Sequence, residues 1–251
     1  MPHTFSDQAI VLRTYDVGEA DRFCILLTRE HGRLPARATG VRRLTSRRGA
    51  TLLTFQCIDI ELSQRSGGQY VIASASIHES FGDISGDLHA YGMAQQGAEL
   101  ILTLIDDGQA VEDIYDLTHA FLSACASHAD ALLYPAFAMQ LLDRLGTLPS
   151  LTLSVVSHRP LEAKAGIAFS RRRGGFCQLD EEPGSARVPD DLYALLCSVL
   201  RAPIDRLPVA PVALARRVQA FVTMMLVDQL EGGGLKSAPV AVRISSGGTP
   251  I

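Results

Sequence analysis

The chain has 251 residues, of which 47% are hydrophobic and 20% charged, and its formal net charge is −4. This is the composition of a folded globular protein. The longest apolar run is far too short to span a bilayer. The five cysteines are scattered without a C-x-x-C pair, which argues against a disulfide framework and for a reducing compartment. We therefore expect a soluble cytoplasmic protein with no membrane partner.

The charge is unevenly distributed along the chain. Residues 1–80 carry a net charge of +2 and residues 81–251 a net charge of −6. Seven arginines and a single acid, Glu30, lie between residues 29 and 48. The arginines are Arg29, Arg33, Arg37, Arg42, Arg43, Arg47 and Arg48. Because a guanidinium group can engage a phosphate with two donors at once, this run favours nucleic acid as the ligand. The alternative is a solvated arginine-rich loop that serves solubility alone.

The first 80 residues are predicted to form five short strands. Apolar runs or alternating apolar residues occupy positions 9–12, 23–27, 34–39, 58–62 and 70–73. Strands of this number and length fit a small Greek-key barrel of the oligonucleotide-binding (OB) type. An SH3-like barrel would produce a similar pattern. The residues between Gly40 and Gly49 would form a loop that can lie along a nucleic-acid strand.

From residue 81 the apolar period becomes helical. Helices are predicted over residues 87–105, 111–126, 134–145, 189–200 and 211–230, with Asp87 as an N-cap. Their apolar stripes are typical of a helical bundle. Residues 151–186 interrupt this pattern with a predicted hairpin whose tip is Arg171, Arg172 and Arg173. The expected fold class is therefore α+β, with an OB barrel over 1–80 and a helical domain over 81–251.

Catalytic signatures are missing from the sequence. It contains no phosphate-binding loop, dinucleotide fingerprint, H-E-x-x-H or G-x-S-x-G motif. The acid pairs at 106–107, 112–113 and 190–191 are expected to cap helices or lie in loops. Cys177 lacks an assignable basic partner and is expected to be a small core residue. We do not expect an enzyme.

A set of ordered motifs resembles a known family. The motifs are residues 9–13 (AIVLR), 18–22 (GEADR), 27–33 (LTREHGR), 40–43 (GVRR), 53–55 (LTF), 141–146 (LLDRLG) and 233–237 (GGLKS). Together they resemble the RecO family of bacterial recombination mediators, most specifically over residues 8–62. The resemblance implies an OB barrel followed by a helical domain, and a non-enzymatic role in DNA repair.

The resemblance also implies partners. Members of this family bind single- and double-stranded DNA, anneal complementary strands and, with RecR, help to load RecA onto DNA coated by single-strand-binding protein. They contact the acidic C-terminal tail of that protein. The expected DNA-binding residues are Arg33, Arg37, Arg42, Arg43, Arg47, Arg48, Arg171, Arg172 and Arg173. The protein would then work in the cytoplasm, associated with the nucleoid.

Two departures from the family pattern affect these expectations. Where many members carry two zinc-binding C-x-x-C pairs, this chain has Ser154 and Ser157, then Cys177 and Asp180. Serines are poor zinc ligands, so residues 151–186 are expected to be a degenerate zinc-finger-like insertion without metal or other cofactor. Before residue 137 the basic residues that some members use for the acidic tail are missing. Arg144, Arg216 and Arg217 are the expected substitutes.

Two other classes of function stay open at this point. One is an OB-fold RNA-binding protein, which competition between matched DNA and RNA strands would reveal. The other is an interaction scaffold whose arginines meet an acidic protein, which predicts no oligonucleotide binding at moderate salt.

Overall fold

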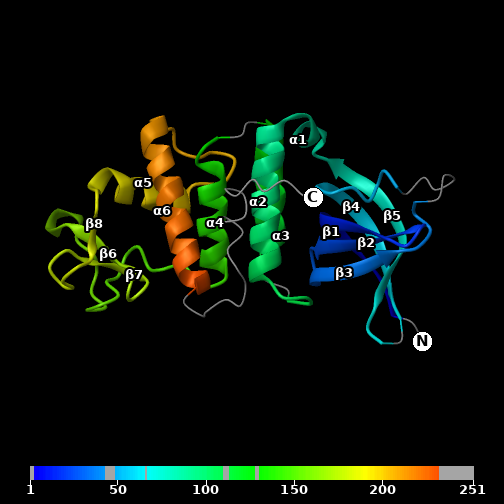
Figure 1. Ribbon diagram of the computed structural model, residues 1–251, viewed down its shortest axis with the longest axis horizontal. Coiled ribbons are helices and arrows are strands. Elements are labelled where there is room, and N and C mark those ends of the chain that lie inside the picture. Colours follow the sequence, from blue (N-terminus) through cyan, green and yellow to red (C-terminus); the bar gives the residue numbers. More distant parts are fainter. Residues whose placement is uncertain (1–2, 43–48, 66, 110–112, 128–129, 232–251) are drawn as a thin grey trace, which may run out of the picture. The chain divides into compact units, whose positions relative to one another are not determined.

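The computed structural model describes residues 3–42, 49–65, 67–109, 113–127 and 130–231. The chain divides into two compact units, Met1–Ala129 and Asp130–Ile251. The first contains a β-barrel and three helices, and the second contains three helices and a small sheet (Figure 1). The predicted arginines 43, 47 and 48 and the motif at residues 233–237 lie outside the described residues.

The first unit begins with a closed five-stranded barrel. Its strands are β1 (His3–Val17), β2 (Asp21–Thr28), β3 (Gly32–Ala38), β4 (Gln56–Gln64) and β5 (Tyr70–Ser80). They follow each other around the barrel in the order β1-β2-β3-β5-β4. The β3–β5 pairing is parallel, and the other pairings are antiparallel. This is the OB arrangement, so the predicted barrel type is confirmed.

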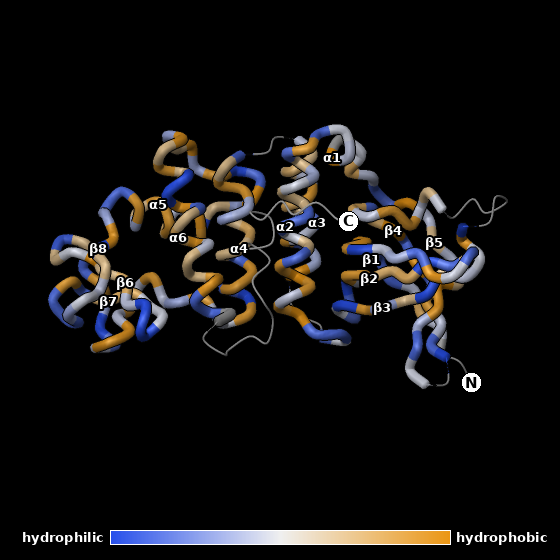
Figure 2. The backbone as a smooth tube through the Cα atoms, in the orientation of Figure 1, coloured by the Kyte–Doolittle hydropathy of each residue, from blue (hydrophilic) through white to orange (hydrophobic). Residues whose placement is uncertain are grey.

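The barrel closes because β1 is long enough to pair on both edges. Residues from His3 to Ile10 pair with β4, and residues from Ala9 to Val17 pair with β2. Alternate side chains point inward, as in β3, where every second residue is buried. The core contains apolar residues from all five strands, including Val11, Cys24, Leu26, Leu34, Ile58, Leu62 and Ile72. Figure 2 shows the resulting hydrophobic stretches along the strands.

Three helices complete the first unit. They are α1 (Gly82–Gly86), α2 (Leu88–Leu104) and α3 (Ile114–Ser127). The predicted cap is confirmed, because the Asp87 carboxylate accepts hydrogen bonds from the amides of His89 and Ala90. These bonds lower the pKa of Asp87. The short α1 was not predicted.

Arg33 joins the barrel to the C-terminal end of α2. Its Nε donates to Asp107 Oδ1 at 2.7 Å, and its Nη1 donates to the carbonyl of Leu102 at 2.6 Å. The backbone adds a third link, in which the amide of Gly108 donates to the carbonyl of Arg33 at 2.7 Å. Only 15% of the Arg33 side chain is exposed. An arginine expected to contact DNA therefore has internal partners within this unit.

The second unit packs α4 (Leu133–Arg144), α5 (Asp190–Arg201) and α6 (Val212–Glu231) together. Gln140 of α4 is buried, and its Nε2 donates to the carbonyls of Val199 and Ala202 at the end of α5. Between α4 and α5 lie a short 3-10 turn, η1 (Ala163–Ala165), and the strands β6 (Ile167–Ser170), β7 (Gly175–Gln178) and β8 (Ala186–Val188). These strands form a sheet in the order β7-β6-β8.

The predicted hairpin is confirmed as β6 and β7, while β8 was not predicted. Aromatic rings pack beneath the sheet: Phe169 lies 5.1 Å from Phe176 and 5.2 Å from Phe221, measured between ring centroids. Within the described ranges, none of the helices combines the length and hydropathy needed to cross a membrane.

Glycine 97 allows α2 and α3 to pack closely, which generates a first prediction. A Cβ atom added at Gly97 would lie 2.3 Å from the Phe121 ring, whereas one added at Gly92 of the same helix meets no atom within 4 Å. Gly92→Ala should stabilise α2 by roughly 0.5–1 kcal/mol through helix propensity. Gly97→Ala should instead lower the free energy of unfolding, because overpacking typically costs about 1–3 kcal/mol. Urea unfolding of both variants would show opposite signs; equal signs would contradict the packing.

Arg33→Ala is expected to lower the stability of the first unit by about 1–3 kcal/mol, because the carbonyl of Leu102 loses its donor and Asp107 its partner. Arg65→Ala is the control, because this arginine is exposed. Amide hydrogen exchange along α2 would report the change. Equal exchange rates in the two variants would show that Arg33 does not hold the helix.

Candidate nucleic-acid interface

Two of the predicted arginines, Arg33 and Arg37, lie on the outer face of the barrel. In β3 the buried residues Leu34, Ala36 and Ala38 alternate with positions that face outward, which place Arg33 and Arg37 on the same outer side. Arg37 donates from Nε to Asp21 Oδ2 at 2.9 Å, and 42% of its side chain is exposed. Unlike Arg33, Arg37 therefore presents a large part of its guanidinium group to solvent.

Two further arginines share one carboxylate, that of Asp16. Arg22 Nε lies 3.1 Å from Asp16 Oδ1, and Arg42 Nε lies 3.3 Å from Asp16 Oδ2. Arg22 also donates to the carbonyls of Gly49 and Leu52, and only 16% of its side chain is exposed. Arg22 thus anchors the chain that follows residue 48, a role that the sequence reading missed. Arg22 belongs to the motif at residues 18–22, which the sequence analysis used only to identify the family.

Arg42 stands at the start of the segment that carries four of the nine arginines predicted to contact DNA. Its Nη1 donates to the carbonyl of Gly18 at 3.0 Å, and 35% of its side chain is exposed. Residues 43–48 follow directly, so the predicted Arg43, Arg47 and Arg48 are outside the described part of the chain. The arrangement around Arg22 and Arg42 fixes both ends of this connection between β3 and β4.

An exposed aromatic ring lies on β1. Tyr15 is 47% exposed, its hydroxyl accepts a hydrogen bond from Arg13 Nη1 at 3.2 Å, and the Arg13 guanidinium lies 6.0 Å from the ring centroid. Arg13 also pairs with Glu99 of α2. An exposed tyrosine beside an arginine can stack against a base while the cation meets a phosphate. Tyr15 was not among the binding residues predicted from the sequence.

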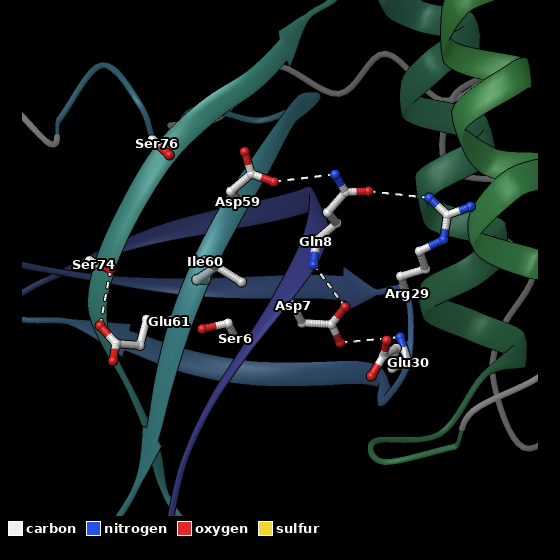
Figure 3. Close-up of a pocket in the computed structure, with 10 residues that line it drawn as sticks. All are labelled: Ser6, Asp7, Gln8, Arg29, Glu30, Asp59, Ile60, Glu61, Ser74 and Ser76. Carbon is white, nitrogen blue, oxygen red and sulfur yellow. Dashed lines mark hydrogen bonds between the residues drawn. The ribbon is translucent and has the colours of Figure 1, made fainter.

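A different region of the same barrel is acidic. A pocket of about 650 Å³ is lined by Asp7, Glu30, Asp59 and Glu61, with Arg29 as its basic residue (Figure 3). Further lining residues are Ser6, Gln8, Ile60, Ser74 and Ser76. Arg29 is turned toward Gln8 and Asp116, to which it donates hydrogen bonds. Carboxylates repel phosphates, so the barrel surface has one region that favours a nucleic-acid strand and one that disfavours it.

His31 belongs to the turn that borders this acidic pocket. Its Nδ1 lies 2.8 Å from Asp7 Oδ2, and its ring lies 4.1 Å from the ring of Phe5. The Asp7 carboxylate also accepts hydrogen bonds from the amides of Gln8 and Glu30. These contacts hold His31 in the turn between β2 and β3.

In the second unit three arginines form the turn between β6 and β7. Arg171 donates from Nε to Asp228 at 2.7 Å, whereas Arg172 and Arg173 donate from Nε to Glu182 at 2.9 and 3.3 Å. Their side chains are 63%, 74% and 43% exposed, respectively. They rim a cavity of about 480 Å³ that is also lined by Thr147, Pro149, Phe169, Met225 and Gln229. The predicted basic tip is thus present, with carboxylates beside it.

The arginines predicted to bind a protein partner have separate surroundings. Arg217 donates to both oxygens of Asp191, at 2.8 and 3.2 Å. Arg144 lies in the last turn of α4 and donates a hydrogen bond to the carbonyl of Gln140. A cation at this position is stabilised by the negative end of the helix dipole. Arg216 is exposed on α6.

The positions that correspond to the family's zinc ligands do not form a metal site. Ser154 donates its hydroxyl proton to Glu181, and burial raises the pKa of the Cys177 thiol, which disfavours the thiolate that zinc requires. Across the described ranges, we find no group of three or more histidine, cysteine, aspartate or glutamate side chains placed to hold a metal ion. The donors present do not fit zinc.

Comparison with known proteins covers nearly the whole chain. Residues 1–81 match the family model for the recombination protein O N terminal, and residues 85–239 match the model for its C terminal. The chain is 32% identical over 200 residues to the DNA repair protein RecO of Bifidobacterium adolescentis, covering 78% of this chain and 81% of the relative. The chain is 35% identical over 197 residues to the DNA repair protein RecO of Bifidobacterium animalis subsp. lactis, covering 76% of this chain and 82% of the relative.

A third relative comes from a different genus. The DNA repair protein RecO of Anaeromyxobacter dehalogenans is 31% identical over 194 residues, covering 76% of each chain. Both family models and the three relatives therefore point to one and the same family. The chain belongs to the RecO family of DNA repair proteins.

Proposed function

We propose that this chain is a non-enzymatic mediator of DNA repair and recombination. It anneals complementary single strands and, with RecR, helps to load RecA onto DNA coated by single-strand-binding protein. The observation that carries this proposal is the match of residues 1–81 and 85–239 to the N-terminal and C-terminal models of the RecO family. The exposed arginines Arg37 and Arg42 on an otherwise acidic protein support it.

The proposed mechanism is charge neutralisation. Two single strands repel each other through their phosphates, and each arginine that engages a phosphate releases condensed counterions. Arg37 pairs with the half-buried carboxylate of Asp21, and Arg42 pairs with the exposed carboxylate of Asp16 and donates to the carbonyl of Gly18. Both arginine side chains are partly exposed, so a phosphate can take the place of the carboxylate in each pair. Arg43, Arg47 and Arg48 extend this surface in the sequence. Bases remain free to pair, because few aromatic side chains are available to hold them.

The second unit would contribute DNA and protein contacts. Arg171, Arg172 and Arg173 are a proposed second DNA surface, and Arg144, Arg216 and Arg217 are proposed contacts for the acidic tail of single-strand-binding protein. Because different arginines would bind the DNA and the tail, the unit could hold a strand and its coating protein at the same time. We further propose that the protein acts in the cytoplasm at the nucleoid, and without the zinc of its relatives.

The salt dependence of binding tests the electrostatic proposal. If four or five arginines engage a single strand, log Kd should change with log salt with a slope of magnitude about 3 to 3.5, at ~0.7 per contact. Changing Arg42, Arg43, Arg47 and Arg48 to Ala should remove most of this slope. Fluorescence anisotropy with a labelled single-stranded oligonucleotide between 50 and 200 mM salt, a range in which such slopes are about linear, measures it.

The control removes the same charge elsewhere. Arg65, Arg187, Arg201 and Arg206 are all exposed. Changing these four to Ala should leave the slope close to that of the wild type. Equal losses in both variants would show that net charge alone governs binding. Competition with an RNA strand of the same sequence separates the RNA-binding alternative, and no binding at moderate salt would favour the scaffold alternative.

The acidic pocket of Figure 3 generates another prediction. Asp59→Asn with Glu61→Gln keeps the side-chain shapes while removing two negative charges from its lining. DNA affinity should rise a few-fold at low salt and return to that of the wild type at about 0.5 M salt, because screening shortens the reach of these charges. Lower DNA affinity in this variant would indicate that the strand binds in the acidic pocket, which would contradict the proposal that DNA binds to the arginines.

A further inference from the structure

The insertion between α4 and α5 contains two turns that the family's metal ion would join. The first turn, at residues 154–157, is held by Ser154, whose Oγ accepts hydrogen bonds from the amides of Val156 and Ser157 at 3.1 and 3.3 Å. Ser154 is buried, with 1% of its surface exposed. The second turn follows β7, where the amide of Glu181 donates to the carbonyl of Gln178.

The carboxylate of Glu181 connects these two turns. Its Oε2 accepts the Ser154 hydroxyl proton and also accepts the amide of Gln178 at 2.9 Å. Beside it, the amide of Val155 donates to the carbonyl of Phe176 at 2.8 Å, a backbone link between the same turns. The hydroxyls of Ser154 and Ser157 lower the pKa of Glu181, as expected for a carboxylate that is hydrogen-bonded in its charged form.

We propose that the Glu181 carboxylate takes the place of the metal ion as the cross-link of this insertion. A metal ion joins turns by attracting thiolates; here a carboxylate joins them by accepting hydrogen bonds from serine hydroxyls and a backbone amide. The ligand positions have changed in a matching way, because Ser154 and Ser157 donate protons where cysteines would donate electron pairs. This inference rests on the second unit alone and is independent of the proposed DNA annealing.

The neighbouring carboxylate, that of Glu182, makes similar hydrogen bonds to the turn between β6 and β7. It is 9% exposed and accepts hydrogen bonds from Arg172, Arg173 and Ser185. Hydrogen bonds from Ser170 and Arg172 lower the pKa of Glu182 to about 2. The two adjacent acids therefore hold both the degenerate zinc turn and the basic tip of the β6–β7 hairpin.

A carboxylate cross-link responds to different conditions from a metal. Chelators should leave it intact.

The test compares two neighbouring acids in the full-length chain. Glu181→Ala should accelerate amide hydrogen exchange at Ser157 and Gln178 by at least about tenfold, as expected for losing a hydrogen bond to a charged group. Asp180→Ala, at the position of a family zinc ligand, should leave both rates unchanged because Asp180 is exposed. Glu181→Gln keeps one acceptor oxygen and should lie between the wild type and Glu181→Ala, which covers the case in which the alanine variant fails to fold.

A second experiment tests for metal binding in the wild-type protein. Zinc content measured by elemental analysis should be well below one ion per chain, and neither EDTA nor added Zn²⁺ should change the melting temperature. One zinc per chain, destabilisation by EDTA, or equal exchange in the Glu181→Ala and Asp180→Ala variants would overturn the proposal.

Discussion

Closure of the barrel by β1 is the constraint on which the surface of the first unit depends. One strand pairs with β2 through its C-terminal half and with β4 through its N-terminal half, so the sheet closes into a ring instead of ending in two edge strands. Once the ring is closed, each strand has one buried face and one outer face. Charged side chains that bind a ligand must then lie on the outer face or in the connections between strands. Arg37 lies on the outer face, and Arg42 lies in a connection.

The arginines on this surface fall into two physical groups. Arg22 and Arg33 donate to backbone carbonyls and are largely covered, so removing them would leave acceptors unsatisfied inside the fold. Arg37 and Arg42 keep exposed guanidinium groups beside carboxylates, and surface pairs of this kind contribute only about 0–1 kcal/mol. The first group holds the scaffold, and the second can exchange partners with a phosphate.

Sequence patterns predicted those parts of the fold that are governed by neighbours along the chain. The strands follow from alternating or continuous apolar residues, and the start of α2 follows from Asp87 with two amides to cap. The helix α1 escaped prediction because its sequence, GDISG, is five residues long and has two glycines. The strand β8 has three residues, two of them exposed, so it leaves no apolar period to detect.

The site was less predictable because its interactions join distant residues. Arg33 was expected to face DNA, but Asp107, 74 positions away, pairs with it. The serines at two of the family's zinc-ligand positions were visible in the sequence. The role of Glu181 was not, because its partner Ser154 is 27 residues away and Glu181 lies one position beyond Asp180, where the family pattern has a cysteine.

We propose that the segment with Arg42, Arg43, Arg47 and Arg48 anneals strands that are coated by single-strand-binding protein. The most direct test is the annealing rate of two complementary fluorescent oligonucleotides precoated with that protein, with the wild type compared to the variant in which these four arginines are changed to alanine. We expect fast annealing by the wild type and loss of annealing in a variant that remains folded. Equal annealing by both would place the DNA surface elsewhere and contradict the claim.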